Sequence, residues 1–437
     1  MIDAPGYALA DCEAAARTHR GPGWLSRLRR EATDAFARLG FPGRAEEGWR
    51  FLDASAVALV GFRPAPARGS REAPAGIPDF GGPRLVFSDG RLVPGLSTPP
   101  PADSGLRVDS LRDVLARSPG AVESVLGRIA DVSAKPFAAL NAALFSDGAL
   151  VRAGKGASPI VPVHLAFVSR AGASPRATHP RVLVVADEGS RCLVVETHHV
   201  LGEGSVLENA VTELAIGRSA RVSHVRISRA PASAFLAACV QAIVGPDGRY
   251  ESWSLPAAAA FSREDAEARL AAPAASCELR CLLVGTGEER LDAHATIDHA
   301  TPGGRSRQDY KAVLGGRARA GFDGRIVVRP GADRTDALQS SRGIILSEGA
   351  IFQARPRLEI RADDVRCAHG ASIGRLDENA LFYLTSRGIG ASGARRLLLE
   401  AFAGSAASGL AEGSVREAFE AAARERLDAA LSEGGPS

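Results

Sequence analysis

The feature that most constrains the fold is a series of short apolar strands separated by glycine-containing turns at nearly regular intervals. Turn sequences at 188–189, 203–204 and 217–218 lie about 15 residues apart, and the glycines from Gly316 to Gly349 keep a similar spacing. No helical segment separates these strands, which disfavours parallel βαβ units. A single coil of this kind cannot bury its apolar face alone. The spacing therefore predicts a stacked β-solenoid, and a β-sandwich with hairpins remains the competing all-β fold.

Helical periodicity flanks this β region on both sides. Apolar residues at helix spacing begin at Trp24 and stop at Gly40, and 133–144 is the best helical segment of the rest of the N-terminal part. After residue 376 we expect three helices. They are a segment that Asp377 opens, a second helix over 394–402, and a third that begins with a capping box at Ser414.

Two breaks divide the chain. The segment 63–83 is rich in Pro, Gly and Ala and resembles a linker, and the segment 169–180 precedes the change to short strands. We therefore expect a helical and mixed α/β region at 1–170, a β core at 171–375 and a helical domain at 376–437.

The composition is that of an ordinary globular protein. Of 437 residues, 45% are hydrophobic and 24% are charged, and the net charge is only +3. Because acidic residues balance the basic ones, nucleic acid is not an expected partner. No apolar stretch approaches the about 18 residues of a membrane span. The first 25 residues carry Asp3, Asp11 and Glu13 where a signal peptide would be apolar. We expect no membrane association and a cytoplasmic location.

The lysines exclude one class of ATPase. The chain contains only Lys135, Lys155 and Lys311, and a P-loop needs Gly-Lys-Ser/Thr to place a lysine beside the phosphates. Lys155 is instead flanked by Gly154 and Gly156. The chain is therefore not expected to be a P-loop ATPase itself.

Six cysteines in a chain of this length do not make a disulfide framework, so reduced thiols are expected. Cys277 and Cys281 have a spacing that a zinc site could use, but no second Cys/His pair of compatible spacing lies nearby. Residues four apart share one face of a strand. We expect two buried structural thiols.

Reactive residue types are densest between Arg361 and Gly374. Cys367 and His369 are two apart, so in a strand they point to the same face, where a thiolate and an imidazole could bind one soft metal or one sulfur species. The alternative is one buried thiol beside one hydrogen-bonded histidine. By contrast, His198 and His199 are adjacent and face opposite sides of a strand, so they cannot chelate together without a bulge.

The third C-terminal helix carries an apolar stripe that includes Val415, Phe419 and Leu427. Such a stripe either packs on its own domain or docks another protein, and the sequence leaves both open.

A long block of motifs resembles the SufB/SufD family of iron–sulfur cluster assembly proteins. The block comprises FDGRIVVRPGADRTDALQSSRGIILSEGA and PRLEIRADDVRCAHGASIGRLDENALFYLTSRGI, and it runs from Phe322 to Ile389 almost without a gap. Weaker similarity extends back to Ile297. The segment EEGWRFLD at 46–53 is similar to an acidic-Trp-basic-aromatic motif of the family.

Within the family, the motif D-D-V-x-C-x-H-G-A followed by L-D-E-x-x-L-F-Y-L-x-S-R-G-I resembles the SufD branch, since SufB members usually have E-H-E-A-T at the corresponding place. Leu338, where an aromatic is common, and Arg355, where lysine is common, are mild departures. The resemblance implies a mostly β fold, with a right-handed parallel β-helix core, an N-terminal α/β region and a C-terminal helical domain.

The resemblance also implies a role. A SufD-type chain is a non-catalytic scaffold subunit that pairs with SufB through the β-helices and binds the ATPase SufC, with its ATP and Mg²⁺, through the C-terminal helices. No tightly bound cofactor is expected, and iron or an iron–sulfur cluster would be held transiently at the SufB–SufD interface. His369 matches the histidine that SufD contributes there, with Cys367 as a second candidate. Around Phe382, Tyr383, Arg387 and Phe419 we expect the ATPase-docking surface.

Two alternatives stay open. The chain could be a SufB-like or homodimeric family member that acts without a distinct partner. It could also be a β-solenoid enzyme such as a polysaccharide lyase, a class that normally needs export and acidic calcium-binding turns.

Overall fold

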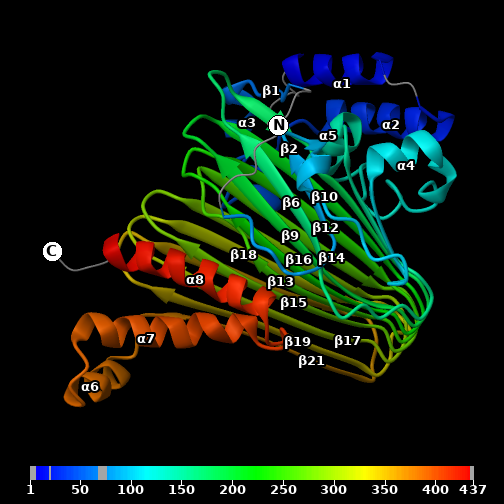
Figure 1. Cartoon of the computed structure of the whole chain (residues 1–437). Coiled ribbons are helices and arrows are strands. Elements are labelled where there is room, and N and C mark those ends of the chain that lie inside the picture. The colour runs from blue at the N-terminus through cyan, green and yellow to red at the C-terminus, as the bar shows by residue number, and fades with distance from the viewer. Residues whose placement is uncertain (1–5, 19–20, 67–75, 434–437) are drawn as a thin grey trace.

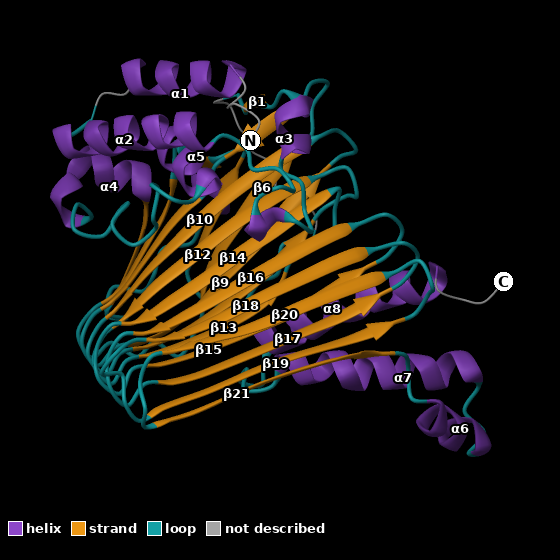
Figure 2. Cartoon of the chain, turned by 180° about the vertical axis from the view of Figure 1, so that it is seen from behind, coloured by secondary structure: helices purple, strands orange, loops and turns teal. Residues whose placement is uncertain are grey.

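The strands of the core coil into a flattened solenoid in which each coil contributes one strand to each of two facing sheets. The computed structural model describes residues 6–18, 21–66 and 76–433; part of the expected linker, 67–75, lies outside them. Figures 1 and 2 show the coils stacked from the N-terminal helices toward the C-terminal helices. Neighbouring strands within the core pair in parallel. The predicted β-solenoid is confirmed, and the hairpin sandwich is excluded by this pairing.

Sheet 1 contains the first strand of each coil. Its core strands are β5 (Gly148–Ala153), β8 (Arg181–Ala186), β10 (Val206–Ile216), β12 (Phe235–Val244), β14 (Phe261–Leu270), β16 (Arg290–His299), β18 (Arg319–Val328) and β20 (Ile351–Ile360). β4 (Leu106–Ser110) pairs antiparallel with β5, and the short β1 (Arg63–Pro64) and β7 (Arg176–Thr178) join its side.

Sheet 2 contains the second strand of each coil. Its core strands are β6 (Val163–Arg170), β9 (Arg191–Leu201), β11 (Arg221–Arg229), β13 (Arg249–Leu255), β15 (Ser276–Gly285), β17 (Arg305–Leu314), β19 (Thr335–Ile345) and β21 (Val365–Gly374). At its N-terminal end β2 (Arg84–Ser88) pairs with β6 in parallel and with β3 (Arg91–Leu92) antiparallel. The spacing of about 15 residues is thus one strand and one turn, or half a coil.

Alternate residues of both sheets fill the lumen between them. The Tyr310 ring from sheet 2 stacks on Phe322 from sheet 1 with 4.1 Å between centroids. Cys277 and Cys281 are buried in this core, and burial raises the pKa of both thiols well above the usual range. The prediction of two buried structural thiols is confirmed. Because β5 pairs in parallel with β8 and β6 with β9, the solenoid covers 148–374 and begins earlier than the expected start of the β core at residue 171.

The N-terminal region packs on the outer face of sheet 1. Its helices are α1 (Gly6–Thr18), α2 (Gly23–Leu39), α3 (Ser55–Val60), α4 (Leu111–Arg117) and α5 (Pro136–Leu144), with short 3₁₀ turns at Glu47–Trp49, Pro94–Leu96 and Pro119–Ala121. As expected, α2 ends at Gly40, which has a φ of 60° and a backbone N–H that donates to Phe36 O.

One residue of this region anchors the segment 46–53 to the sheet. Trp49 is buried and packs among Phe137 and Phe261, and the Arg263 guanidinium lies 4.2 Å from its ring centroid. Arg263 also donates to Gly48 O at 2.7 Å and pairs with Asp292 at 2.6 Å. The segment 46–53 is therefore fixed across the outer face of β14 and β16.

The C-terminal helices are α6 (Glu378–Ser386), α7 (Ala391–Gly404), a 3₁₀ turn (Ser405–Ala407) and α8 (Ser414–Glu433). The apolar faces of α7 and α8 cover the outer face of sheet 2 (Figure 1). Trp253 on β13 donates to Ser408 O at 3.0 Å, and Arg229 pairs with Glu425 at 3.0 Å. The three expected C-terminal helices are present, and two of them are bound firmly to the solenoid. Within the described residues, the chain has no helix with the length and apolarity needed to traverse a membrane.

Candidate functional site

Among the described residues, no further strand covers the C-terminal end of the solenoid. β20 and β21 are the last strands of their sheets, and each has a core strand on one side only. Val328 on β18 is fully buried, whereas Ile360, beside it in the register on β20, is 41% exposed, and Ile373 on β21 is 47% exposed. Two free strand edges and the end of an apolar core are thus presented together. Such edges pair readily with a strand of another chain.

His369 and Cys367 lie on β21, at this open end. The register places Cys367 beside Ala337 and His369 beside Gln339 of β19. As alternate residues of one strand, the two face the same side, in agreement with the prediction. Cys367 is half-buried against the core, and burial raises the pKa of its thiol. His369 is exposed. The imidazole is therefore open to an incoming partner or ion, while the thiol stays protonated in the isolated chain.

A polar ladder leads from the lumen to His369. Gln308 on β17, Gln339 on β19 and His369 on β21 occupy the same place in three successive coils. Both glutamines are buried, and Gln339 Nε2 donates to Gln308 Oε1. Gln339 Oε1 has no hydrogen-bond partner in the described part of the chain. The strand neighbour of His369 in the register thus carries a buried acceptor without a partner. Sequence reasoning missed this ladder, although glutamines in apolar strands one coil apart were a usable signal.

A second polar group fills the lumen nearer the N-terminal end. His198 Nδ1 lies 2.7 Å from Glu208 and its Nε2 lies 3.1 Å from Glu196, which also bonds His224 at 2.9 Å. Burial opposes charge on His198, but the two carboxylates outweigh it and raise the pKa of the imidazole. Its neighbour His199 points elsewhere, and burial lowers the pKa of that imidazole to about 4. The prediction that these two histidines diverge is confirmed.

The residues predicted to form the docking surface differ in exposure. Phe419 is 1% exposed and packs between α8 and sheet 2, so it supports the fold and is not available to a partner. The apolar stripe of α8 that contains Phe419 therefore packs on its own domain and does not dock another protein. Phe382 is 74% exposed and Tyr383 55% exposed on α6, and the Arg387 guanidinium lies 4.8 Å from the Tyr383 ring centroid.

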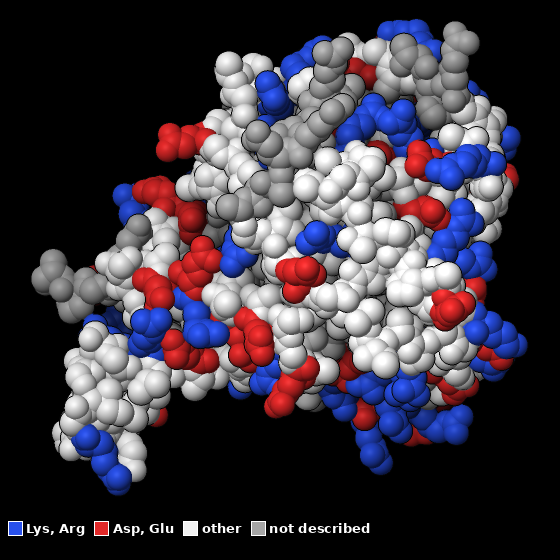
Figure 3. Space-filling view, in the orientation of Figure 1, with Lys and Arg blue, Asp and Glu red and all other residues white. Residues whose placement is uncertain are grey.

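Helix α6 projects from the body of the molecule (Figure 1), and its surface in Figure 3 carries little charge, whereas acidic and basic residues mix over the rest of that face. None of the residues of α6 is buried. A short helix with exposed aromatic side chains, held away from its own core, is typical of a contact surface for another protein.

Comparison with known proteins identifies the family. Residues 167–402 match the domain described as SUF system FeS cluster assembly, SufBD core domain. The chain belongs to the SufBD family. An iron–sulfur cluster assembly SufBD family protein of Synechocystis is 30% identical over 392 residues, which cover 87% of this chain and 86% of the relative.

Two relatives named iron–sulfur cluster assembly protein SufD are also similar. The Escherichia coli protein is 27% identical over 89% of this chain and 90% of its own length. The Bacillus subtilis protein is 29% identical over 60% of both chains. The SufBD core match begins in β6 and ends in α7, so it includes the open end of the solenoid and the exposed helix α6. Within the described residues, no group of three His, Cys, Asp or Glu side chains is arranged so that it could hold a metal ion.

Proposed function

We propose that this SufBD family chain is the SufD-type subunit of an iron–sulfur cluster assembly scaffold. The observation that carries the proposal is the uncovered solenoid end, where two free strand edges, an exposed apolar rim and His369 lie together. The motif around Cys367 and His369, which resembles the SufD branch, and the similarity to proteins named SufD support this subtype.

In this proposal β20 and β21 pair with the corresponding end of a SufB-type chain. Strand pairing satisfies the free backbone groups of both edges, and closing the rim removes Ile360 and Ile373 from water. The contact between the two chains, which we call the seam, then encloses His369. A neutral imidazole is a good ligand for iron, and a hydrogen bond from its other ring nitrogen to an acceptor fixes its orientation. Iron, or the growing cluster, is the cargo, and His369 supplies one ligand from this side of the seam.

We assign Cys367 a smaller role in binding iron or sulfide than His369. Its thiol faces the same side as His369 but lies deeper, and its raised pKa disfavours the thiolate that binds metal or sulfide. It gains a role only if the partner or the bound iron stabilises the thiolate. We therefore assign His369 as the first ligand and Cys367 as an auxiliary one.

The chain acts without catalysis of its own. Because it lacks a P-loop, ATP and Mg²⁺ belong to a SufC-type ATPase, which we place on α6 through Phe382, Tyr383 and Arg387. Closure of two such ATPases on nucleotide would move the paired scaffolds, provided that they contact α6 differently in the two nucleotide states.

The alternative is a homodimer. The same free edges of β20 and β21 could pair with a second copy of this chain, which would place two His369 side chains at one seam.

Native mass spectrometry distinguishes a SufD-type subunit from a homodimer. It is carried out under anaerobic conditions on this chain co-expressed with the SufB-type and SufC-type proteins of its source. A complex of one copy of this chain, one SufB-type chain and two ATPases supports the SufD-type assignment. If the chain stays alone with both partners present, the proposal is wrong, and if it pairs only with itself, the homodimer replaces it.

A further inference from the structure

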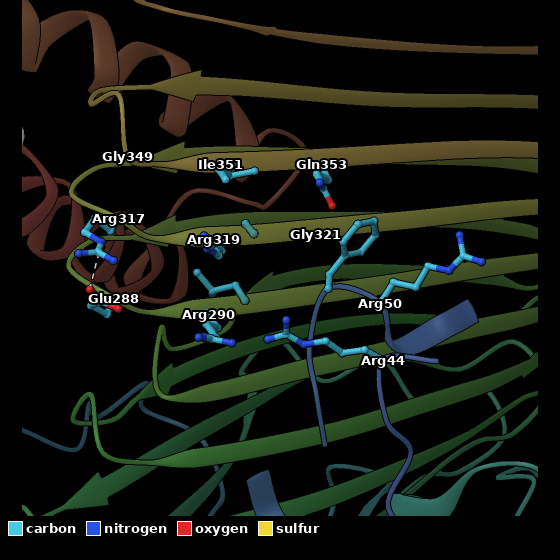
Figure 4. A pocket seen from close by; sticks show the side chains of 13 residues that line it. Arg44, Arg50, Glu288, Arg290, Arg317, Arg319, Gly321, Gly349, Ile351 and Gln353 are labelled. Atoms are coloured by element: carbon cyan, nitrogen blue, oxygen red, sulfur yellow. Dashed lines mark ion pairs between the residues drawn. The ribbon is translucent and has the colours of Figure 1, made fainter. Parts of the chain in front are cut away.

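A cationic cavity lies on the outer face of sheet 1, where it crosses β16, β18 and the edge strand β20. It has a volume of about 340 Å³, within the range of small-molecule sites. Its walls come from segment 44–51 on one side and from the starts of β16, β18 and β20 on the other. Figure 4 shows this arrangement. Five arginines line it, with Glu288 as the one acidic residue: Arg44, Arg50, Arg290, Arg317 and Arg319.

Most of this positive charge is not neutralised within the chain. Arg317 pairs with Glu288 at 3.1 Å, and Arg44 makes a long contact of 3.8 Å with Asp53. Across the described residues, no carboxylate lies within 4 Å of the guanidinium groups of Arg50, Arg290 or Arg319. Several other arginines of sheet 1 are paired with acidic neighbours, as Arg325 is with Glu359 at 2.7 Å.

The strand register forces two of these unpaired charges together. Arg290 on β16 lies directly beside Arg319 on β18. Like charges opposite one another on neighbouring strands destabilise a sheet. In Figure 4 the Arg44 side chain also extends from its segment toward Arg290. The guanidinium groups of Arg44, Arg290 and Arg319 thus lie near one another. The acidic side chain in the lining, Glu288, already pairs with Arg317. An anion between the three guanidinium groups would turn this repulsion into attraction.

We propose that this cavity binds a small molecule bearing a diphosphate group. Guanidinium groups donate paired hydrogen bonds in a geometry that fits phosphate oxygens, and several of them match the multiple negative charge of a diphosphate. The Phe51 side chain gives one apolar wall. A neighbouring cavity of about 570 Å³ shares Arg44, Glu288 and Arg290 and is lined by Phe235 and Phe261, so it has room for an apolar part of the same molecule.

A folded macromolecule is a less suitable occupant than a small molecule. The arginines line a recess between a peptide segment and a sheet rather than an extended surface, and the chain as a whole is nearly neutral. The segment that forms one wall is itself held in place by Trp49 and Arg263, so the recess is built before any ligand enters.

Isothermal titration calorimetry of the full-length chain with sodium pyrophosphate, at constant ionic strength in chloride, tests the proposal. We expect one pyrophosphate per chain. Arg290→Gln and Arg319→Gln should each weaken binding about tenfold, because each removes a charge-assisted hydrogen bond to phosphate. Arg221→Gln is the matched control, since Arg221 is an exposed arginine at the start of β11, on the other sheet. It should leave the affinity within about twofold of the wild-type chain.

Three results would overturn the proposal. They are the absence of binding heat, an equal loss of affinity in Arg221→Gln, and tighter binding of a glutamate-rich peptide than of pyrophosphate. The last result would assign the recess to an acidic protein segment. Circular dichroism of each variant shows whether the fold is intact. The cavity includes Ile351 and Gln353 of the edge strand β20, but pyrophosphate binding is measured on the isolated chain. Failure here therefore does not test strand pairing with a SufB-type chain or the role of His369.

Discussion

The Arg387 guanidinium carbon lies 4.8 Å from the centroid of the Tyr383 ring, so the last turn of α6 holds a cation against an exposed aromatic face. This contact orients the ring without burying it. It therefore presents Tyr383, together with the neighbouring Phe382, as a preformed apolar surface.

If α6 docks the ATPase, the double variant Phe382→Ala and Tyr383→Ala should weaken capture of a SufC-type protein by about 30-fold or more, since buried aromatic anchors are typical hot spots. Surface plasmon resonance with the ATPase immobilised measures this. Leu59→Ala, which removes an exposed apolar side chain from α3, is the control and should leave binding unchanged. Equal binding by the two variants would show that α6 is not the docking surface.

The open end of the solenoid gives a second prediction. Ile373→Lys places a charge on the exposed rim, so the isolated chain should keep its stability while affinity for a SufB-type chain falls about 100-fold, because an unpaired charge would be buried in the seam. Ile160→Lys is the control, since Ile160 is exposed on the loop before β6. Size-exclusion chromatography with light scattering reads out the complex. An intact complex with Ile373→Lys would place the interface elsewhere.

His369→Ala tests the ligand. The side chain is exposed, so the variant should fold and form the complex, but it should reduce the yield of iron–sulfur cluster by about tenfold or more, because one ligand to the cargo is lost. The absorbance of the cluster, measured on the purified complex, gives the yield. His294→Ala provides a comparison at a histidine on β16, two strands in from the edge strand β20. An unchanged yield in the intact complex would remove His369 from the mechanism.

Gln339→Leu tests the polar ladder. It keeps most of the volume but removes the buried polar group of the residue paired with His369 in the strand register. We expect iron retention in the complex to fall about tenfold, as when an outer hydrogen-bond partner of a metal ligand is lost. Gln308→Leu is matched, because it breaks the same glutamine pair one coil farther from His369. Both variants should lose about 1–3 kcal/mol of stability from the partner left unpaired. A similar iron retention in both would show that the ladder only supports the fold.

The buried histidines predict how stability depends on pH. Burial is the largest cause that lowers the pKa of His164 and of His179 to about 3, and of His199 and of His299 to about 4. The unfolded chain takes up these protons near pH 6.5, whereas the folded chain does not. Stability is therefore full above that pH and falls as the pH drops, by about 1.4 kcal/mol per pH unit for each histidine.

His198 has the opposite sign. Its raised pKa means that its contribution to stability is present below pH 6.5 and is lost as the pH rises through the folded value, so it opposes the loss caused by the other four histidines. Urea unfolding at pH 7.5 and 5.5 checks the net loss. His179→Gln should reduce the difference between the free energies of unfolding at the two pH values, because glutamine does not take up a proton on unfolding. A chain as stable at pH 5.5 as at 7.5 would contradict the prediction.

Local chemistry determined much of this protein before any tertiary contact. Turn residues such as Gly189 and Gly217 mark where strands must end, the Asp377 side chain caps α6, and Gly40 ends α2, since each acts through its own backbone or that of its near neighbours. The position of His369 two residues from Cys367 on one face of a strand follows from the same local rule.

Only the tertiary structure decided which residues meet. The stripe containing Phe419 and the aromatic pair on α6 are both apolar, yet sheet 2 covers the first and leaves the second in water. The alignment of Gln339 beneath His369 depends on the register of strands a full coil apart. The approach of Arg44 to Arg290 depends on Trp49 docking across β14 and β16. Stacking energy is shared by a whole coil, so no short stretch of sequence carries it.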